Sequence, residues 1–231
     1  MQPDISYIFT FSDGREERIV LTLDPTSGDI VYPDKDSAAQ PPPDWAILGY
    51  KQCQHCPLQQ DEVTYCPIAR NIAHLFADKN TGTSYEAVSL RVEMGARSYL
   101  FETTAQRALS SLFGLICALS PCPHTQPLKP LGVMHLPLAS DIETLMRISS
   151  LFLLRSYLAH QDNPALPIDL SEMQSTYQNL AQLNKDMAVR LRAASSSDAA
   201  VNAITLLDVL VKDVRFVMDS QLQLLKDLMN I

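Results

Sequence analysis

Four cysteines constrain the fold of this chain more than any other feature of its sequence. Cys53 and Cys56 form a Cys-x-x-Cys pair, Cys66 lies ten residues further on, and Cys122 follows after a long interval. A Cys-x-x-Cys turn lets two thiolates point at one centre, and two more thiolates would complete the tetrahedral shell of a structural zinc ion. We therefore expect Cys53, Cys56, Cys66 and Cys122 to bind one metal ion.

Other interpretations of the same cysteines stay open. His55 or His124 could replace one cysteine as a ligand. An iron–sulfur cluster also uses four thiolates, although the spacing does not match either ferredoxin run. A Cys-x-x-Cys pair can also carry thiol redox chemistry, but the strand–helix context of such sites is absent here. The cysteines could finally be small buried apolar residues, which is what we expect of Cys117.

The charge balance limits the classes of partner. The chain of 231 residues has 18 Lys and Arg against 26 Asp and Glu, a formal net charge of -8. Such a chain lacks the basic footprint of nucleic-acid binding and of binding to anionic membranes. The amino-terminus does not resemble a signal peptide, and no apolar run reaches the roughly 18–20 residues of a spanning helix. We expect no membrane insertion and a cytoplasmic location, where clustered cysteines more often bind metal than form disulfides.

Alternating apolar residues predict two β-hairpins. Ile5, Tyr7 and Phe9 alternate with other residues before an Asp13-Gly14 turn, and the pattern resumes over residues 19–23 and again at 30–32. Asp-Gly between alternating runs is a strong hairpin signal. Residues 85–101 repeat the pattern around a Met94-Gly95 turn. An antiparallel sheet is therefore expected.

Helices are predicted between and after the strands. Pro67 is suited to the first helical position after Cys66, and Thr103-Thr104 could cap a helix that runs to about Leu119. Ser140 with Glu143 predicts the start of another helix. Residues 33–44 and 125–139 are rich in proline and are expected to be irregular.

The carboxyl-terminal third carries helical stripes. Apolar residues from Leu170 to Leu191, and again from Ala203 to Ile231, follow spacings of three and four. This pattern is typical of a helical hairpin or coiled coil. We therefore predict an α+β domain over residues 1–165, with a cysteine-rich loop at 51–66. A helical hairpin over 166–231 would follow it and could form a homo-oligomer.

A second group of polar residues could carry chemistry. His135 precedes a predicted helix that contains Glu143, Arg147 and Tyr157, and these four side chains could line a pocket. The competing interpretation is a cluster that caps the helix and forms ion pairs on the surface. No phosphate-binding glycine loop, nucleophile elbow or His-Glu-x-x-His motif occurs.

Several short motifs together resemble an uncharacterised bacterial family with a domain-of-unknown-function label. They are Cys-x-x-Cys-Pro, Tyr65–Ala69, Ser110–Leu115, Ser120–His124, His135–Pro137 and Glu143-Thr144-x-x-Arg147. The resemblance covers about residues 5–165. It implies a bacterial cytosolic protein without a known activity, and it assigns no role to any residue.

These observations favour a non-enzymatic protein that a metal ion, zinc above all, holds together. Its carboxyl-terminal helices would bind a protein partner or a second copy of the chain. Two alternatives remain: an enzyme or redox protein that uses the cysteines or a pocket near His135, and a small-molecule sensor.

Overall fold

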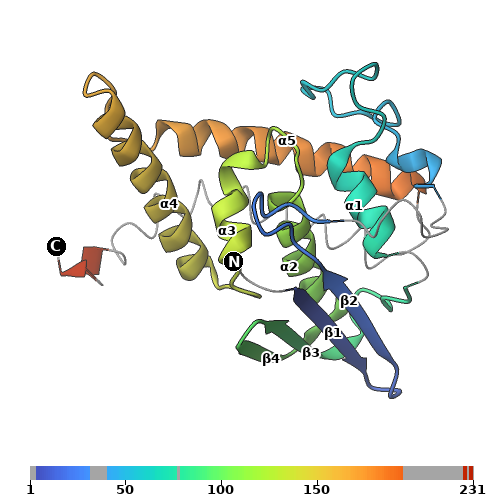
Figure 1. Cartoon of the computed structure of the whole chain (residues 1–231). Helices are drawn as coiled ribbons and strands as arrows, with labels where there is room; N and C mark the ends of the chain where they lie inside the picture. Colours follow the sequence, from blue (N-terminus) through green and yellow to red (C-terminus); the bar gives the residue numbers. More distant parts are fainter. Residues whose placement is uncertain (1–3, 32–40, 77–78, 195–225, 228, 231) are drawn as a thin grey trace.

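The structure is a computed structural model that describes residues 4–31, 41–76, 79–194, 226–227 and 229–230. It combines one four-stranded sheet with five α-helices (Figure 1). The strands are β1 (Ile5–Phe11), β2 (Glu16–Leu21), β3 (Ala87–Met94) and β4 (Arg97–Thr104). The helices are α1 (Pro67–Leu75), α2 (Ala105–Ala118), α3 (Lys129–Val133), α4 (Asp141–Asp162) and α5 (Ser171–Ala194), with short 3-10 turns at Asp44–Ala46 and Gln126–Leu128. The predicted α+β class is confirmed.

The sheet is antiparallel, with strand order β2-β1-β3-β4. Both predicted hairpins form, and their turns contain Gly14 and Gly95 at positive φ, which glycine adopts without strain. The hairpins meet along β1 and β3, where Tyr7 lies opposite Val92. Near residue 30 the predicted further strand is reduced to a single bridge between Leu23 and Ile30.

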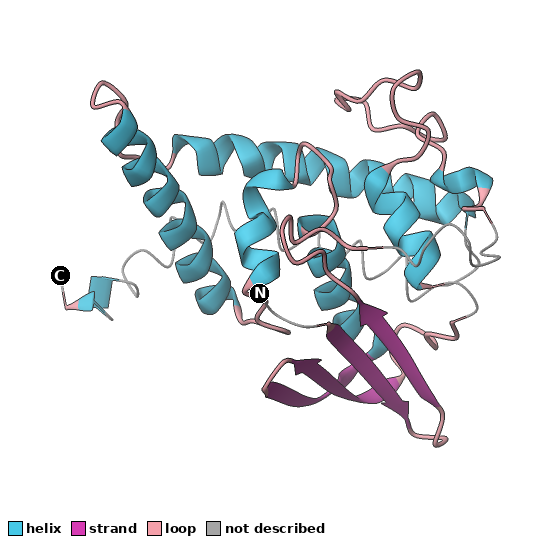
Figure 2. Ribbon diagram, in the orientation of Figure 1, coloured by secondary structure: helices cyan, strands magenta, loops and turns pink. Residues whose placement is uncertain are grey.

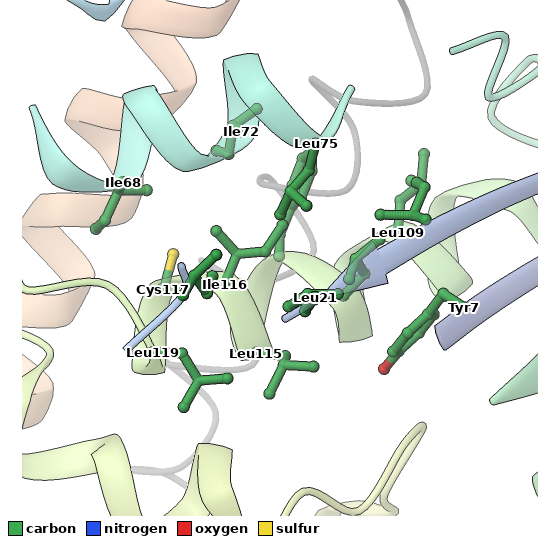
Figure 3. Close-up of a cluster of buried hydrophobic side chains, with 14 of the residues drawn as sticks. Tyr7, Leu21, Ile68, Ile72, Leu75, Leu109, Leu115, Ile116, Cys117 and Leu119 are labelled. Carbon is green, nitrogen blue, oxygen red and sulfur yellow. The ribbon is translucent and has the colours of Figure 1, made fainter. Parts of the chain in front are cut away.

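One face of the sheet packs against the helices, which lie together on one side of it (Figure 2). Alternate residues of each inner strand are buried there because successive side chains of a strand point to opposite faces. Helix α2 is the central element of this core and is buried around most of its circumference. Figure 3 shows Tyr7 and Leu21 beside residues of α1 and α2 in this cluster.

The helix starts follow local sequence signals. Pro67 occupies the first turn of α1 and Cys66 is its N-cap residue. Helix α4 begins with the predicted capping box, in which Ser140 and Glu143 bond each other's backbone amides. Thr104 is the N-cap residue of α2, but its hydroxyl makes no capping hydrogen bond.

Residues 125–139 are more regular than expected. They contain the 3-10 turn and the five residues of α3, because prolines are compatible with the first turn of a helix. Helix α3 packs closely on the end of α2: a Cβ on Gly132 would lie 2.8 Å from Cδ2 of Leu119. This contact needs a residue without a side chain.

Helix α5 corresponds to the first half of the predicted helical hairpin. Its stripe packs within the same chain, with Met173, Tyr177 and Leu180 in a small cluster against α4 and with Met187 and Leu191 in the main core. The second half falls largely in residues 195–225, outside the described residues, and the coiled coil is not shown. Of the described helices, none is both long and apolar enough to cross a membrane.

Candidate functional site

The four cysteines of the predicted metal set come from three separate segments that share one neighbourhood. Cys53 and Cys56 lie on a turn closed by a 3.0 Å hydrogen bond from the amide of Cys56 to the carbonyl of Cys53. Cys66 is at the start of α1, and Cys122 lies four residues after the end of α2. Cys66 and Cys122 are buried in the main core, and Cys56 packs against it. Two helix termini and one loop therefore converge.

The electrostatics of these thiols reflect burial and mutual proximity. Burial, and then the nearby Cys66, Asp186, Cys122 and Cys56, raise the pKa of Cys53 to about 12. Burial raises the pKa of Cys122 to about 11. It also raises that of Cys66, although amides of the first turn of α1 and Arg190 act in the opposite direction. A bound cation is one way to convert such thiols into thiolates at neutral pH.

Arg190 of α5 is a positive charge buried in the same region. Its side chain is only 1% exposed and donates hydrogen bonds to the carbonyls of Trp45, Ile47 and Leu48 at 2.8 to 3.1 Å. Its Nε has no hydrogen-bond partner within the part of the chain that the structure describes. Among the described residues, no carboxylate lies within ion-pair distance of it. Burying an unpaired charge is costly, and the described part of the chain supplies no counter-ion to this guanidinium.

The alternate ligands His55 and His124 serve as a link between segments. Their rings stack with centroids 4.0 Å apart, and Nε2 of His124 lies 2.9 Å from the carbonyl oxygen of His55. Nε2 of His55 lies 3.0 Å from the carbonyl oxygen of Asn179 on α5, and its Nδ1 lies 4.0 Å from a carboxylate oxygen of Asp186. The cysteine loop is thereby tied to α5 and to the turn at Cys122.

As they stand, no three or more histidine, cysteine, aspartate or glutamate side chains within the described residues are arranged to hold a metal ion. The set of Cys53, Cys56, Cys66 and Cys122 accordingly stays a prediction. Cys117 lies in the main core, where burial raises the pKa of its thiol.

A second candidate site is a cavity of about 570 Å³ between α2, α3, α4 and α5. His135 and Arg147 of the predicted pocket both line it. Glu143 is engaged in the capping box with Ser140 at the start of α4. Tyr157 is about half exposed further along α4 and does not line the cavity.

Three hydrogen-bonding side chains meet at one side of this cavity. The hydroxyl of Tyr7 lies 2.5 Å from Nε2 of His135 and 3.0 Å from Oγ of Ser111. Oγ of Ser111 also accepts a hydrogen bond from the amide of Leu138. Burial, together with Arg147, lowers the pKa of His135 to about 3, so the imidazole is neutral near pH 7.

The sequence alone did not identify Tyr7, Ser111 or Arg190 as site residues. Tyr7 continues an apolar strand pattern, and Arg190 lies within a helical stripe. The two adjacent serines at 110 and 111, in the middle of a mostly apolar helix, are the available signal for the cavity.

The family comparison covers nearly the whole chain. The family described as Domain of unknown function (DUF6901) matches residues 5–230, which confirms the expected uncharacterised family and extends it through the carboxyl-terminal residues. No curated protein and no solved structure matches the chain. A match of this extent shows that the chain belongs to the DUF6901 family, a domain of unknown function.

Proposed function

We propose that the chain is a non-enzymatic binding or assembly protein held together by one zinc ion on Cys53, Cys56, Cys66 and Cys122. One observation carries this proposal: cysteines of three distant segments share one neighbourhood, and one of them, Cys66, lies near the buried Arg190, for which the described residues offer no carboxylate at ion-pair distance. Four thiolates around a divalent ion leave two negative charges on the centre. That charge would supply the counter-ion that Arg190 lacks.

A structural role fits this donor set better than a catalytic one. Catalytic zinc keeps an open position for water, whereas a shell of four cysteines is closed. To complete a closed shell of four ligands, the thiol side chains would have to shift. The irregular backbone of the loop at 51–66 is compatible with such a shift. The ion would connect segments about 70 residues apart in sequence, and clips that close long loops stabilise a fold most.

Elemental analysis of the purified full-length chain tests the metal. We expect one zinc per chain in the wild type, and loss of zinc with a lower unfolding midpoint in Cys53→Ser and Cys122→Ser. Cys117→Ala is the matched control, since Cys117 is a buried cysteine outside the set, and it should keep its zinc. A wild type without metal, together with an unchanged midpoint in Cys53→Ser, would overturn the proposal. If the analysis finds iron and inorganic sulfide instead of zinc, the four cysteines hold an iron–sulfur cluster.

Exposed apolar residues on α4 support assembly with a second copy of the chain. Leu154 is 54% exposed, Leu158 is 53% exposed, and Tyr157 lies between them. Large apolar residues grouped on one helix often mark an interaction surface. The apolar stripe predicted within residues 203–231 could contribute to the same interface.

Light scattering on the full-length chain tests this assembly. We expect a dimer that the double variant Leu154→Glu with Leu158→Glu converts to a monomer. Gln161→Glu is the control, because it adds a negative charge to the same helix without removing an apolar side chain. A wild-type protein that is monomeric across the micromolar range would contradict self-association. Leu154 and Leu158 would then serve contacts within the chain.

A further inference from the structure

The cavity between α2, α3, α4 and α5 has the size and the walls of a small-molecule site. Its volume of about 570 Å³ lies within the range of roughly 300–1,000 Å³ that is typical of ligand pockets. Its apolar wall comes from four different elements and the segment before α4; it includes Leu115, Leu131, Leu138, Ile148 and Leu180. Such a wall suits an aliphatic or aromatic body.

The charged groups around the cavity favour one negative charge in the ligand. Arg107 and Asp141 are both exposed at its edge and carry opposite charges, so their long-range effects offset each other. Arg147 is the remaining charged side chain that lines the cavity and is half-buried, and Glu143, whose charge acts on it, is engaged in the capping box. Among the described residues, no carboxylate lies within ion-pair distance of its guanidinium.

Arg147 is held in place by backbone rather than by a counter-ion. Its Nη2 donates to the carbonyls of Met134 at 2.7 Å and Leu131 at 3.2 Å. These bonds use one nitrogen of the planar guanidinium. A guanidinium fork matches a carboxylate in bidentate geometry, which the compact ammonium of lysine does not.

Neutral hydrogen-bonding groups lie in the same wall. Oγ of Ser110 is buried without a hydrogen-bond partner in the described residues, although Ser110 is only 4% exposed. Ser111 and the neutral His135 are fixed by their hydrogen bonds through Tyr7. The Oγ of Ser110 is closed to solvent, so Ser110 contributes to the shape of the wall and presents no donor to a ligand.

We propose that this cavity binds a monoanionic carboxylate with an apolar body, of the class of medium-chain fatty acids. Arg147 binds the carboxylate, and the leucine and isoleucine side chains of the wall enclose the chain. Such binding goes beyond the structural role proposed for the metal ion, and the residues that line the cavity do not include Cys53, Cys56, Cys66 or Cys122.

Calorimetric titration of the full-length protein with three ligands of equal chain length tests the proposal. Decanoate, decanol and decylamine differ only in their head groups and are used below their micelle concentrations. We expect decanoate to bind at least tenfold more tightly than decanol, and decylamine not to bind. Equal affinity for decanoate and decanol, or no heat of binding with any of them, would overturn the proposal.

Variants locate the site. Arg147→Gln should weaken decanoate at least tenfold and leave decanol unchanged, because a charge-assisted pair is lost. Arg155→Gln on the same helix is the matched control, since Arg155 pairs with Glu172 on the surface, and it should bind decanoate as the wild type does.

Thr144→Phe is a second variant that keeps the proposal testable if Arg147→Gln does not fold. Thr144 lines the cavity from α4, and none of its side-chain atoms is needed for the capping box. The larger ring should weaken decanoate and decanol alike. Unchanged binding of decanoate to a folded Thr144→Phe protein would show that the ligand lies elsewhere, for instance on the exposed residues of α4.

Discussion

The cysteine neighbourhood and the cavity are built in different ways. The cysteines lie mostly on irregular backbone, at a loop, an N-cap position and a turn. The cavity is walled mainly by helices whose starts and packing are fixed by capping and by close contacts. Groups on regular elements are positioned before a ligand arrives, whereas groups on loops need a bound ion or a network of bonds to fix them. The two regions should therefore respond differently to substitution.

The largest effect should follow removal of Arg190, which bonds three carbonyls of the segment beside the cysteines. Replacing it by leucine leaves one buried and two partly buried carbonyls without this donor, so we expect a loss of about 3–5 kcal/mol in the free energy of unfolding. Urea denaturation measures it, with the exposed Arg192→Leu as control. A change below about 0.5 kcal/mol, the size of an ordinary surface substitution, would show that the cysteine side does not depend on this network.

Acid should weaken the cavity side through His135. Its pKa is about 3 in the folded chain against 6.5 as a free side chain, so the unfolded state binds more protons between these values. Stability is therefore complete above about pH 6.5 and falls by up to about 1.4 kcal/mol per pH unit below it. Denaturation from pH 7 to 4.5 should give a shallower slope for His135→Gln than for the wild type. Other histidines contribute equally to both curves, so identical slopes would contradict the burial of this imidazole.

The smallest effect concerns the start of α4. Ser140→Ala removes the hydroxyl of the capping box, and we expect a loss of about 1 kcal/mol. Thermal unfolding measures the change, and Ser150→Ala, in the middle of the same helix and exposed, is the control. Equal losses in the two variants would mean that the cap does not fix this wall of the cavity.

Local sequence signals predicted most of the helices and strands, but they could not predict contacts between residues far apart in the sequence. The alternation around Asp13-Gly14 gave the first hairpin, and Ser140 with Glu143 gave the start of α4. The contact between Tyr7 and His135 joins residues 128 positions apart, and no local pattern encodes it. An apolar helical stripe likewise indicates which face is buried, but it does not identify the residues that pack on that face. For α5 these residues belong to the core of the same chain.

The site predictions divide along the same line. The structure brings His135 and Arg147 together at one cavity, because both lie near the start of α4. Arg190 could not be found in this way, since its role depends on carbonyls more than 140 positions away in sequence.

Helix α5 reaches both regions. Tyr177, Leu180 and Asn184 line the cavity, while Arg190, further along the same helix, holds the segment beside the cysteines. If the proposed ligand or metal ion shifted α5 at one end, the rigid helix would carry that shift to the other end. Such a coupling is symmetrical: if zinc tightens carboxylate binding by some factor, the carboxylate tightens zinc by the same factor. A single helix would thus make the metal content of the chain a readout of its small-molecule ligand.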